Sequence, residues 1–422
     1  MNAESQQPPS RLARRLGTGD AVLIGLGSMI GAGVFAAIGP AAAAAGGGLL
    51  IGLGIAAVVA YCNATSSAQL AALYPASGGT YVYGRKRLGS FWGFLAGWGF
   101  VVGKTASCAA MALTFGNYID EELARPLAVA AVLALSAVNY LGVRKTAGLT
   151  RVIVFVVVLA LAVVVVVSFT VPSAGGGFGS LGAGGVGGVL EAAGLLFFAF
   201  AGYARIATLG EEVRDPARTV PLAIPIALGI TLVVYTAVAT TALLAVGPAA
   251  LAASPAPLVT VAEAGSVAGA EQAVKIGAAV GSLGVLLSLL VGVSRTTFAM
   301  ASGRDLPRWL DSVHARNRVP DRAELVVGVV VIAVVLVADV RGAIGFSSFA
   351  VLLYYALANA SAWTLRAHER RWPRVLSALG LVGCLLIAFS LPRASVIGGT
   401  VVVLVGTAIW LARRRLSGRT PT

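Results

Sequence analysis

The stretch from Gly25 to Pro40, GLGSMIGAGVFAAIGP, constrains the fold most, because it is apolar enough for a bilayer yet too rich in glycine for a regular helix. Each glycine weakens a helix interior by about 0.8–1 kcal/mol relative to alanine, so unwinding is easiest between Gly27 and Gly33. Unpaired backbone groups are costly in hydrocarbon, so a break there must line a cavity with a polar occupant. The pattern predicts a broken helix whose free N–H groups face an anion such as a carboxylate. Gly27 and Gly31 also form a G-x-x-x-G pattern, for which close helix packing is the alternative.

The composition places the whole chain among the polytopic membrane proteins. Hydrophobic residues make up 58% and charged residues 11% of the 422 residues, and 53 are glycine. The mean hydropathy is +0.89. Since a span needs about 20 apolar residues, the apolar runs predict an all-α protein with twelve transmembrane helices. The predicted spans lie near residues 20–44, 48–72, 91–118, 125–142, 150–171, 188–210, 222–247, 272–301, 324–340, 343–365, 373–391 and 394–412.

The positive charge of the chain follows the predicted loops. The formal net charge is +14, yet with the N-terminus inside the cell 24 of the 31 Lys and Arg residues fall in cytoplasmic segments. The positive-inside rule therefore predicts that both termini are cytoplasmic. We expect a multi-pass protein of the cell (inner) membrane that contacts membrane lipids and has no nucleic-acid partner. The first apolar run is too long and too glycine-broken for a cleavable signal, so we expect a retained span.

Three basic residues interrupt apolar spans. Lys104 lies near the middle of span 91–118, Arg205 follows the break expected in the sixth span, and Arg295 lies inside span 272–301. A lysine at the bilayer centre costs about 2.5–3.5 kcal/mol even on a lenient scale, so it must face protein or water. Snorkelling to the interface is the alternative. We expect Lys104 to titrate or to compensate charge; Arg205 and Arg295 are alternatives that suit a counter-charge better, because arginine keeps its proton.

A second informative stretch runs from Phe197 to Ile224, FFAFAGYARIATLGEEVRDPARTVPLAI. Its charges exclude a uniform lipid-facing helix, and its aromatic, glycine and small residues predict a break near Ala199 to Gly202. Carbonyl oxygens freed by such a break suit an ammonium group. For the charged residues beyond the break, the alternative is a set of ordinary ion pairs at the membrane surface.

The two broken spans are the first and the sixth. Paired discontinuous helices at corresponding positions of two halves indicate a transporter site near the bilayer midplane. An offset of five spans reverses the side from which the second half enters, which predicts a five-plus-five inverted repeat with two extra C-terminal helices. The expected organisation is a cytoplasmic tail (1–19), a first repeat (20–171), an extracellular link (172–187), a second repeat (188–366), the extra pair (367–412) and a cytoplasmic tail (413–422).

Four motifs in this order resemble those of the amino acid-polyamine-organocation superfamily of permeases, and in particular the bacterial amino acid permeases. They are GSMIGAGVF in span 1, PASGGTYVYGR after span 2, FFAFAGY followed by EEVRDPARTVP in span 6, and SRTTFAMASGRDLP at the end of span 8. The resemblance covers spans 1 to 10. It implies the inverted-repeat fold with broken helices 1 and 6 and transport by alternating access.

The resemblance also implies substrate-binding residues. It assigns the carboxylate-binding loop to Ser28, Met29, Ile30, Gly31, Ala32 and Gly33. Its ammonium-binding carbonyls match Phe198, Ala199, Phe200 and Gly202. The nearest match to an aromatic gate over the substrate is Tyr203 or Phe200.

The chain departs from this superfamily in two places. Proton-coupled relatives can carry a lysine in span 5 in the place of a sodium ion, whereas the corresponding Phe155 to Val158 is apolar here. Relatives that carry cationic amino acids place a carboxylate in span 3, where this chain has Gly103 and Lys104. A cationic side chain would meet like charge, so we expect a preference for neutral over cationic amino acids.

We therefore expect a secondary active amino acid transporter, with proton-coupled uptake and no cofactor or metal. The alternative within the fold is an uncoupled exchanger of amino acids or polyamines, favoured by the apolar span 5. A channel is the alternative of another class, but it requires a continuous polar lining and only separated polar points occur. An enzyme is not expected, because His314 and His368 lie in predicted loops without a nucleophile or ligand cluster nearby.

Overall fold

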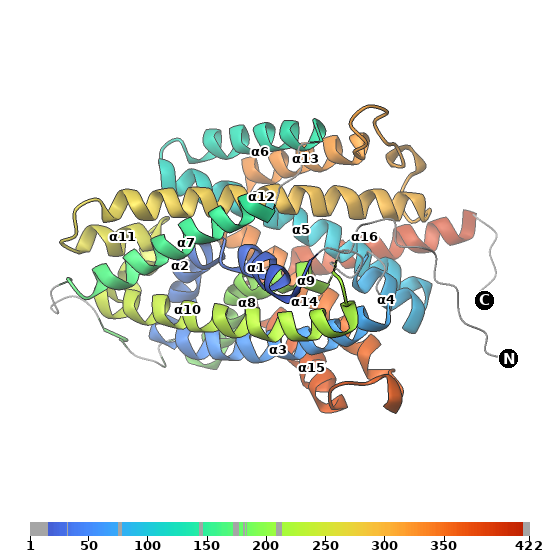
Figure 1. Ribbon diagram of the computed structural model, residues 1–422, viewed down its shortest axis with the longest axis horizontal. Coiled ribbons are helices and arrows are strands. Elements are labelled where there is room, and N and C mark those ends of the chain that lie inside the picture. Colours follow the sequence, from blue (N-terminus) through green and yellow to red (C-terminus); the bar gives the residue numbers. More distant parts are fainter. Residues whose placement is uncertain are drawn as a thin grey trace.

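The computed structural model describes residues 16–31, 33–74, 78–142, 147–171, 177–179, 182, 184–207 and 213–416. Within these ranges the chain is helical and has no strand longer than an isolated bridge between Leu16 and Val213. Most helices run roughly along the longest axis of the molecule and form one bundle (Figure 1). The all-α prediction is therefore confirmed for the described residues.

The helices of the first part of the chain are interrupted early. In order they are α1 (Thr18–Met29), α2 (Gly33–Ala45), the 3-10 turn η1 (Gly46–Gly48), α3 (Leu49–Leu73), α4 (Thr80–Arg87), α5 (Ser90–Ile119), α6 (Ala124–Tyr140) and α7 (Ala147–Ser168).

The second part of the chain begins with another interrupted helix. Its helices are α8 (Gly185–Phe200), η2 (Ala201–Tyr203), α9 (Ala204–Ala207), α10 (Pro216–Ala253), α11 (Pro257–Ala264), α12 (Ala270–Ser302), η3 (Arg308–Leu310), α13 (Asp321–Val337), α14 (Val340–Trp363), η4 (Ala367–Glu369), α15 (Arg374–Ser390) and α16 (Arg393–Leu416).

Both predicted helix breaks occur. In the first apolar stretch α1 ends at Met29 and α2 begins at Gly33. Within this gap Ala32 lies outside the described residues. In the sixth stretch the α-helix ends at Phe200 and changes to the 3-10 turn η2. The interruptions fall where the glycine and small residues weaken a continuous helix.

The lengths and hydropathies of the helices fit a multi-pass membrane protein. In the part of the chain described here, eight segments are long and apolar enough to span a bilayer. One of them, Gly33–Leu73, joins α2, η1 and α3, whereas α6 and α15 are apolar but shorter. The number of twelve spans and the inverted repeat therefore stay predictions.

The broken helices lie in the middle of the bundle (Figure 1). Helices α2 and α3 pack against α8, and α10 packs against α1, α2 and α3. A second group, α5, α12 and α14, encloses them from the other side, with α5 in contact with both of its partners. Helix α16 lies on the outside, since only 17% of its apolar window is buried. This arrangement leaves the two breaks as the shared centre of both groups.

Candidate functional site

The two helix breaks touch each other through backbone atoms. A Cβ atom at Gly33 would lie 2.5 Å from the Cα of Ala199, and one at Gly202 would overlap the Ser28 carbonyl oxygen. Only glycine permits this approach of one main chain to another. The N-terminal end of α2 and the C-terminal end of α8 are consequently held side by side.

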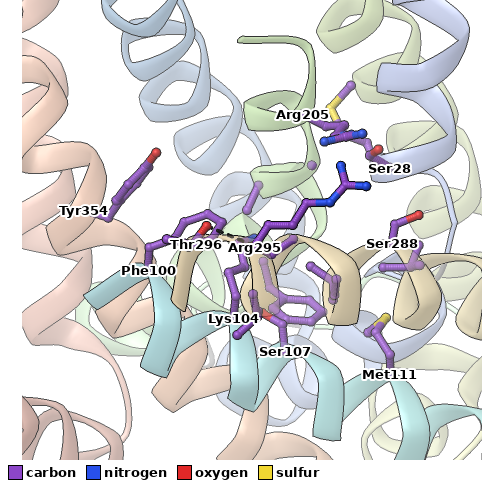
Figure 2. Close-up of a pocket in the computed structure, with 18 of the residues that line it drawn as sticks. Ser28, Phe100, Lys104, Ser107, Met111, Arg205, Ser288, Arg295, Thr296 and Tyr354 are labelled. Atoms are coloured by element: carbon purple, nitrogen blue, oxygen red, sulfur yellow. Dashed lines mark hydrogen bonds between the residues drawn. The ribbon is translucent and has the colours of Figure 1, made fainter. Parts of the chain in front are cut away.

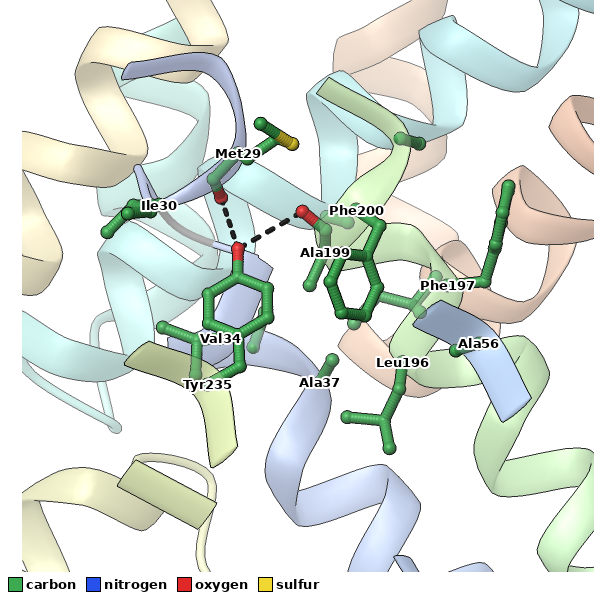
Figure 3. Close-up of a cluster of buried hydrophobic side chains, with 14 of the residues drawn as sticks. Met29, Ile30, Val34, Ala37, Ala56, Leu196, Phe197, Ala199, Phe200 and Tyr235 are labelled. Atoms are coloured by element: carbon green, nitrogen blue, oxygen red, sulfur yellow. Dashed lines mark hydrogen bonds between the residues drawn. The ribbon is translucent and has the colours of Figure 1, made fainter. Parts of the chain in front are cut away.

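A single tyrosine joins the breaks. The Tyr235 hydroxyl, from α10, lies 2.5 Å from the Met29 carbonyl oxygen and 3.1 Å from that of Ala199, as the dashed lines in Figure 3 show. Its ring packs edge-on against Phe200 at a centroid distance of 5.3 Å. Since the hydroxyl has one hydrogen, it donates to one carbonyl at a time. Tyr235 therefore couples the position of α1 to that of α8.

Two long helices supply the opposite wall of the site. On α5 the residues at i, i+4, i+7 and i+11 from Phe100 face the same space, and on α12 the residues from Ser288 onward follow a similar period. This spacing puts side chains on one face of an α-helix. Two helix faces and two helix breaks together enclose a cavity of about 320 Å³.

The cavity is lined by residues from α1, α2, α5, α8, η2, α9, α12 and α14, and by two residues in and before α4. They are Ser28, Met29, Gly33, Gly78, Tyr81, Phe100, Lys104, Ser107, Met111, Phe198, Ala201, Gly202, Arg205, Val285, Ser288, Leu289, Gly292, Val293, Arg295, Thr296, Ala299 and Tyr354. The volume suits a small organic molecule of amino-acid size.

The charged groups of the lining are all basic. Lys104 is 8% exposed, whereas Arg205 and Arg295 are exposed. Figure 2 shows Arg295 extending from α12 toward Arg205 and Ser28. Near Lys104, Ser107 and Ser347 share a hydrogen bond of 2.6 Å between their hydroxyls, which ties α5 to α14. The cavity thus combines hydroxyl groups and positive charge.

An ionic cluster borders the cavity at α4. The Tyr81 hydroxyl donates to Asp305 at 2.7 Å, and Arg85 forms an ion pair with the same carboxylate. Burial and the hydrogen bond to Asp305 raise the pKa of Tyr81, so it remains protonated. Farther out, Arg87 pairs with Glu369 at 2.7 Å. That hydrogen bond holds the pKa of Glu369 below its ordinary value. The segment predicted as either a loop or a gate element is therefore a short helix fixed by ion pairs.

Eight of the predicted site residues line the cavity. They are Ser28, Met29, Gly33, Phe198, Gly202, Lys104, Arg205 and Arg295.

The remaining predicted residues lie in the surrounding packing. Ile30 is buried, and a side chain at Gly31 would overlap Val285 of α12. The Ala199 carbonyl faces Tyr235, and Phe200 packs on the Tyr235 ring. Tyr203 stacks on Tyr355 at 5.0 Å between ring centroids. Ala32 is outside the described residues.

Sequence reasoning missed several lining residues on apolar helices. Phe100, Ser107 and Met111 lie on the same face of α5 as Lys104. Their helical spacing from Lys104 is the signal that locates them once Lys104 is taken as a cavity residue. Tyr354 of α14 contacts Phe100 with ring centroids 5.4 Å apart. Neither Tyr354 nor Tyr235 has a local sequence signal, because only the fold brings it to the breaks.

No group of three or more His, Cys, Asp or Glu side chains suitable for a metal ion occurs in the ranges that the structure describes. The lining has no carboxylate, imidazole or thiol. Its polar groups are hydroxyls, ammonium, guanidinium and backbone. These groups bind an anionic or zwitterionic molecule rather than a metal cation.

The chain is similar to known transporters over almost its full length. A family model described as amino acid permease matches residues 16–410. An uncharacterized transporter of Mycobacterium tuberculosis is 62% identical over 415 residues, which cover 97% of this chain and 94% of that protein. The branched-chain amino acid permease of Bacillus subtilis is 25% identical over 438 residues, covering 96% and 94%. Cationic amino acid transporter 4 of Homo sapiens is 29% identical over 404 residues, covering 88% of this chain and 62% of that protein.

Proposed function

This chain belongs to the amino acid permease family, a family of membrane transporters rather than enzymes, and from that premise we propose a secondary active amino acid transporter that works by alternating access. The observation that carries the proposal is the pairing of opposite helix ends at one cavity. The N-terminal end of α2 and the C-terminal end of α8 meet there. They offer complementary partial charges to the two ends of a zwitterion.

The substrate carboxylate binds at the start of α2. The first N–H groups of a helix have no intrahelical partner, and the helix dipole adds positive potential at that end. We assign this role to the segment from Ser28 to Gly33. The Ser28 hydroxyl now donates to the Ile24 carbonyl at 2.9 Å, which keeps its oxygen available as an acceptor.

The substrate ammonium group binds at the end of α8. Carbonyl oxygens at a helix C-terminus carry partial negative charge, and we assign this role to Phe198, Ala199, Phe200 and Gly202. Phe198 is the aromatic residue of this group that lines the cavity, whereas Phe200 and Tyr203 pack behind it. We therefore propose Phe198 as the aromatic cover over the substrate.

Alternating access follows from the way the breaks are joined. In the proposed five-plus-five arrangement, α1, α2, α8 and α9 rock against the group that contains α5 and α12. The Tyr235 hydroxyl keeps the two broken helices together as they move. Both termini are proposed to lie in the cytoplasm and the protein in the cell (inner) membrane, in agreement with the distribution of basic residues.

Protons are the proposed coupling ion, with Lys104 as the group that exchanges them. It is a buried basic residue in the cavity lining, which places its charge state under the influence of the substrate. The same lysine opposes a cationic substrate, so neutral amino acids are preferred over cationic ones. The two relatives named for a substrate differ in its charge, and the selectivity is therefore argued from Lys104 itself.

The test is uptake of radiolabelled amino acids into proteoliposomes with and without an inward proton gradient. Accumulation that requires the gradient supports proton-coupled uptake, and its loss in Lys104→Met supports the role of Lys104. Full gradient-driven uptake by Lys104→Met would remove Lys104 from the mechanism.

An uncoupled exchanger of amino acids or polyamines is the second candidate. It is favoured by α7, where Phe155 is 69% and Val158 is 39% exposed and no basic group stands in for a sodium ion. Counterflow without any ion gradient, together with no net accumulation, would establish it. Single-channel current in planar bilayers would instead indicate a channel.

A further inference from the structure

The charges in the cavity lining are unbalanced. Three of the lining residues are basic, Lys104, Arg205 and Arg295, and none is acidic. A zwitterion brings one charge of each sign and leaves this excess unchanged. The imbalance therefore indicates an additional negative group on the molecule that occupies the cavity.

Lys104 carries the strongest part of this argument. Its side chain is 8% exposed and lies on the cavity face of α5, next to the Ser107 hydroxyl in the lining. None of the ion pairs recorded for the described residues includes Lys104. Burying an ammonium group without a counter-ion costs several kcal/mol, so a ligand that supplies a carboxylate here gains a large differential interaction.

Arg295 adds a second positive charge from the neighbouring helix. It follows Ser294 on α12, and the hydroxyl of Ser294 turns away from the cavity to the buried Glu324, at 3.3 Å from the carboxylate. Glu324 does not line the cavity. In Figure 2 the guanidinium of Arg295 and the side chain of Lys104 lie on either side of the space that α5 and α12 enclose. Ser107, Ser288 and Thr296 supply hydroxyls along the same walls.

We propose that the preferred substrate is an acidic amino acid, a dicarboxylate of the size of glutamate or aspartate. This inference rests on the proposed function. The α-carboxylate and α-ammonium groups bind at the ends of α2 and α8, and the side-chain carboxylate binds to the Lys104 ammonium with Arg295 contributing at the mouth. The order of preference is acidic before neutral and neutral before cationic.

The decisive comparison is between L-glutamate and L-glutamine, which have nearly the same shape and differ by one charge. Purified full-length protein in detergent is titrated with each, and binding is measured by thermal shift and isothermal titration. We expect glutamate to bind at least about tenfold more tightly, because hydrogen bonds between charged groups are the stronger class. L-Lysine is expected to bind least.

Variants identify the group that recognises the charge. Lys104→Met removes the ammonium but keeps most of the side-chain volume, and it is expected to bring the glutamate to glutamine ratio close to one. Lys104→Arg is expected to keep the preference. Lys275→Gln serves as the control, because Lys275 pairs with Glu271 at 2.7 Å on α12 and does not line the cavity.

The failures of the two proposals are distinguishable. Tighter binding of glutamine than glutamate by the wild-type protein overturns the acidic preference and leaves amino acid transport intact. Absence of binding and uptake for every amino acid overturns the proposed function and this inference with it. The wild-type comparison needs no variant, so poor folding of Lys104→Met does not rescue the proposal.

Discussion

Replacement of Tyr235 by phenylalanine tests the joint between the two broken helices. The change deletes one oxygen and keeps the ring contact with Phe200 at 5.3 Å. Tyr235 is 2% exposed, so water does not easily take the place of the hydroxyl. Leaving a buried carbonyl without its donor costs about 1–3 kcal/mol. The two hydrogen bonds are not summed, because the hydroxyl has a single hydrogen.

This cost falls on the arrangement in which Met29 and Ala199 are held together. If that arrangement binds the substrate, Tyr235→Phe weakens binding by about 5–150-fold, the factor that corresponds to 1–3 kcal/mol. The measurement is substrate affinity by titration, together with the melting temperature of the purified protein.

The control is Tyr61→Phe, because Tyr61 is 42% exposed on the outer face of α3. It is expected to keep the affinity and melting temperature of the wild type. If Tyr235→Phe behaved like Tyr61→Phe in both measurements, the joint between the breaks would have no energetic role.

Three further outcomes are expected. Gly202→Ala places a methyl group against the Ser28 carbonyl and should abolish uptake, whereas Gly54→Ala, in open space, should leave it unchanged. Asp305→Asn removes the charge that Arg85 pairs with and should change the ratio of inward to outward transport rates, read from uptake and efflux in oriented vesicles. Because the pKa of Glu369 is lowered in the folded protein, its pairing with Arg87 stabilises above the ordinary carboxyl pKa and is lost as the pH falls below about 4.5. Wild-type melting should therefore fall more steeply there than that of Glu369→Gln.

The positions of the helix breaks are predictable from the sequence because their cause is local. Glycine weakens a helix wherever it occurs, and Gly27 to Gly33 brackets the gap between α1 and α2. Lys104 is predictable for a related reason, since a charge inside a long apolar run must face the interior. These features need no knowledge of neighbouring helices.

The partners of the breaks are not predictable in this way. Tyr235 lies in the apolar α10, and nothing nearby in the sequence distinguishes it from a packing residue. Which aromatic residue of α8 faces the cavity depends on the rotation of the helix, since adjacent residues differ by about 100°. That rotation places Phe198 in the lining and Phe200 behind it. It is set by packing against α2, α3 and α10, which comes from distant parts of the chain.

The hydroxyl of Tyr235 faces two carbonyl oxygens with one hydrogen, so the centre of the bundle has one more acceptor than donor. A visiting primary amine brings three N–H bonds to a place with a surplus of lone pairs. Its arrival would release Tyr235 from serving both helices in turn, and an occupied protein would differ from an empty one in how firmly its two halves are tied.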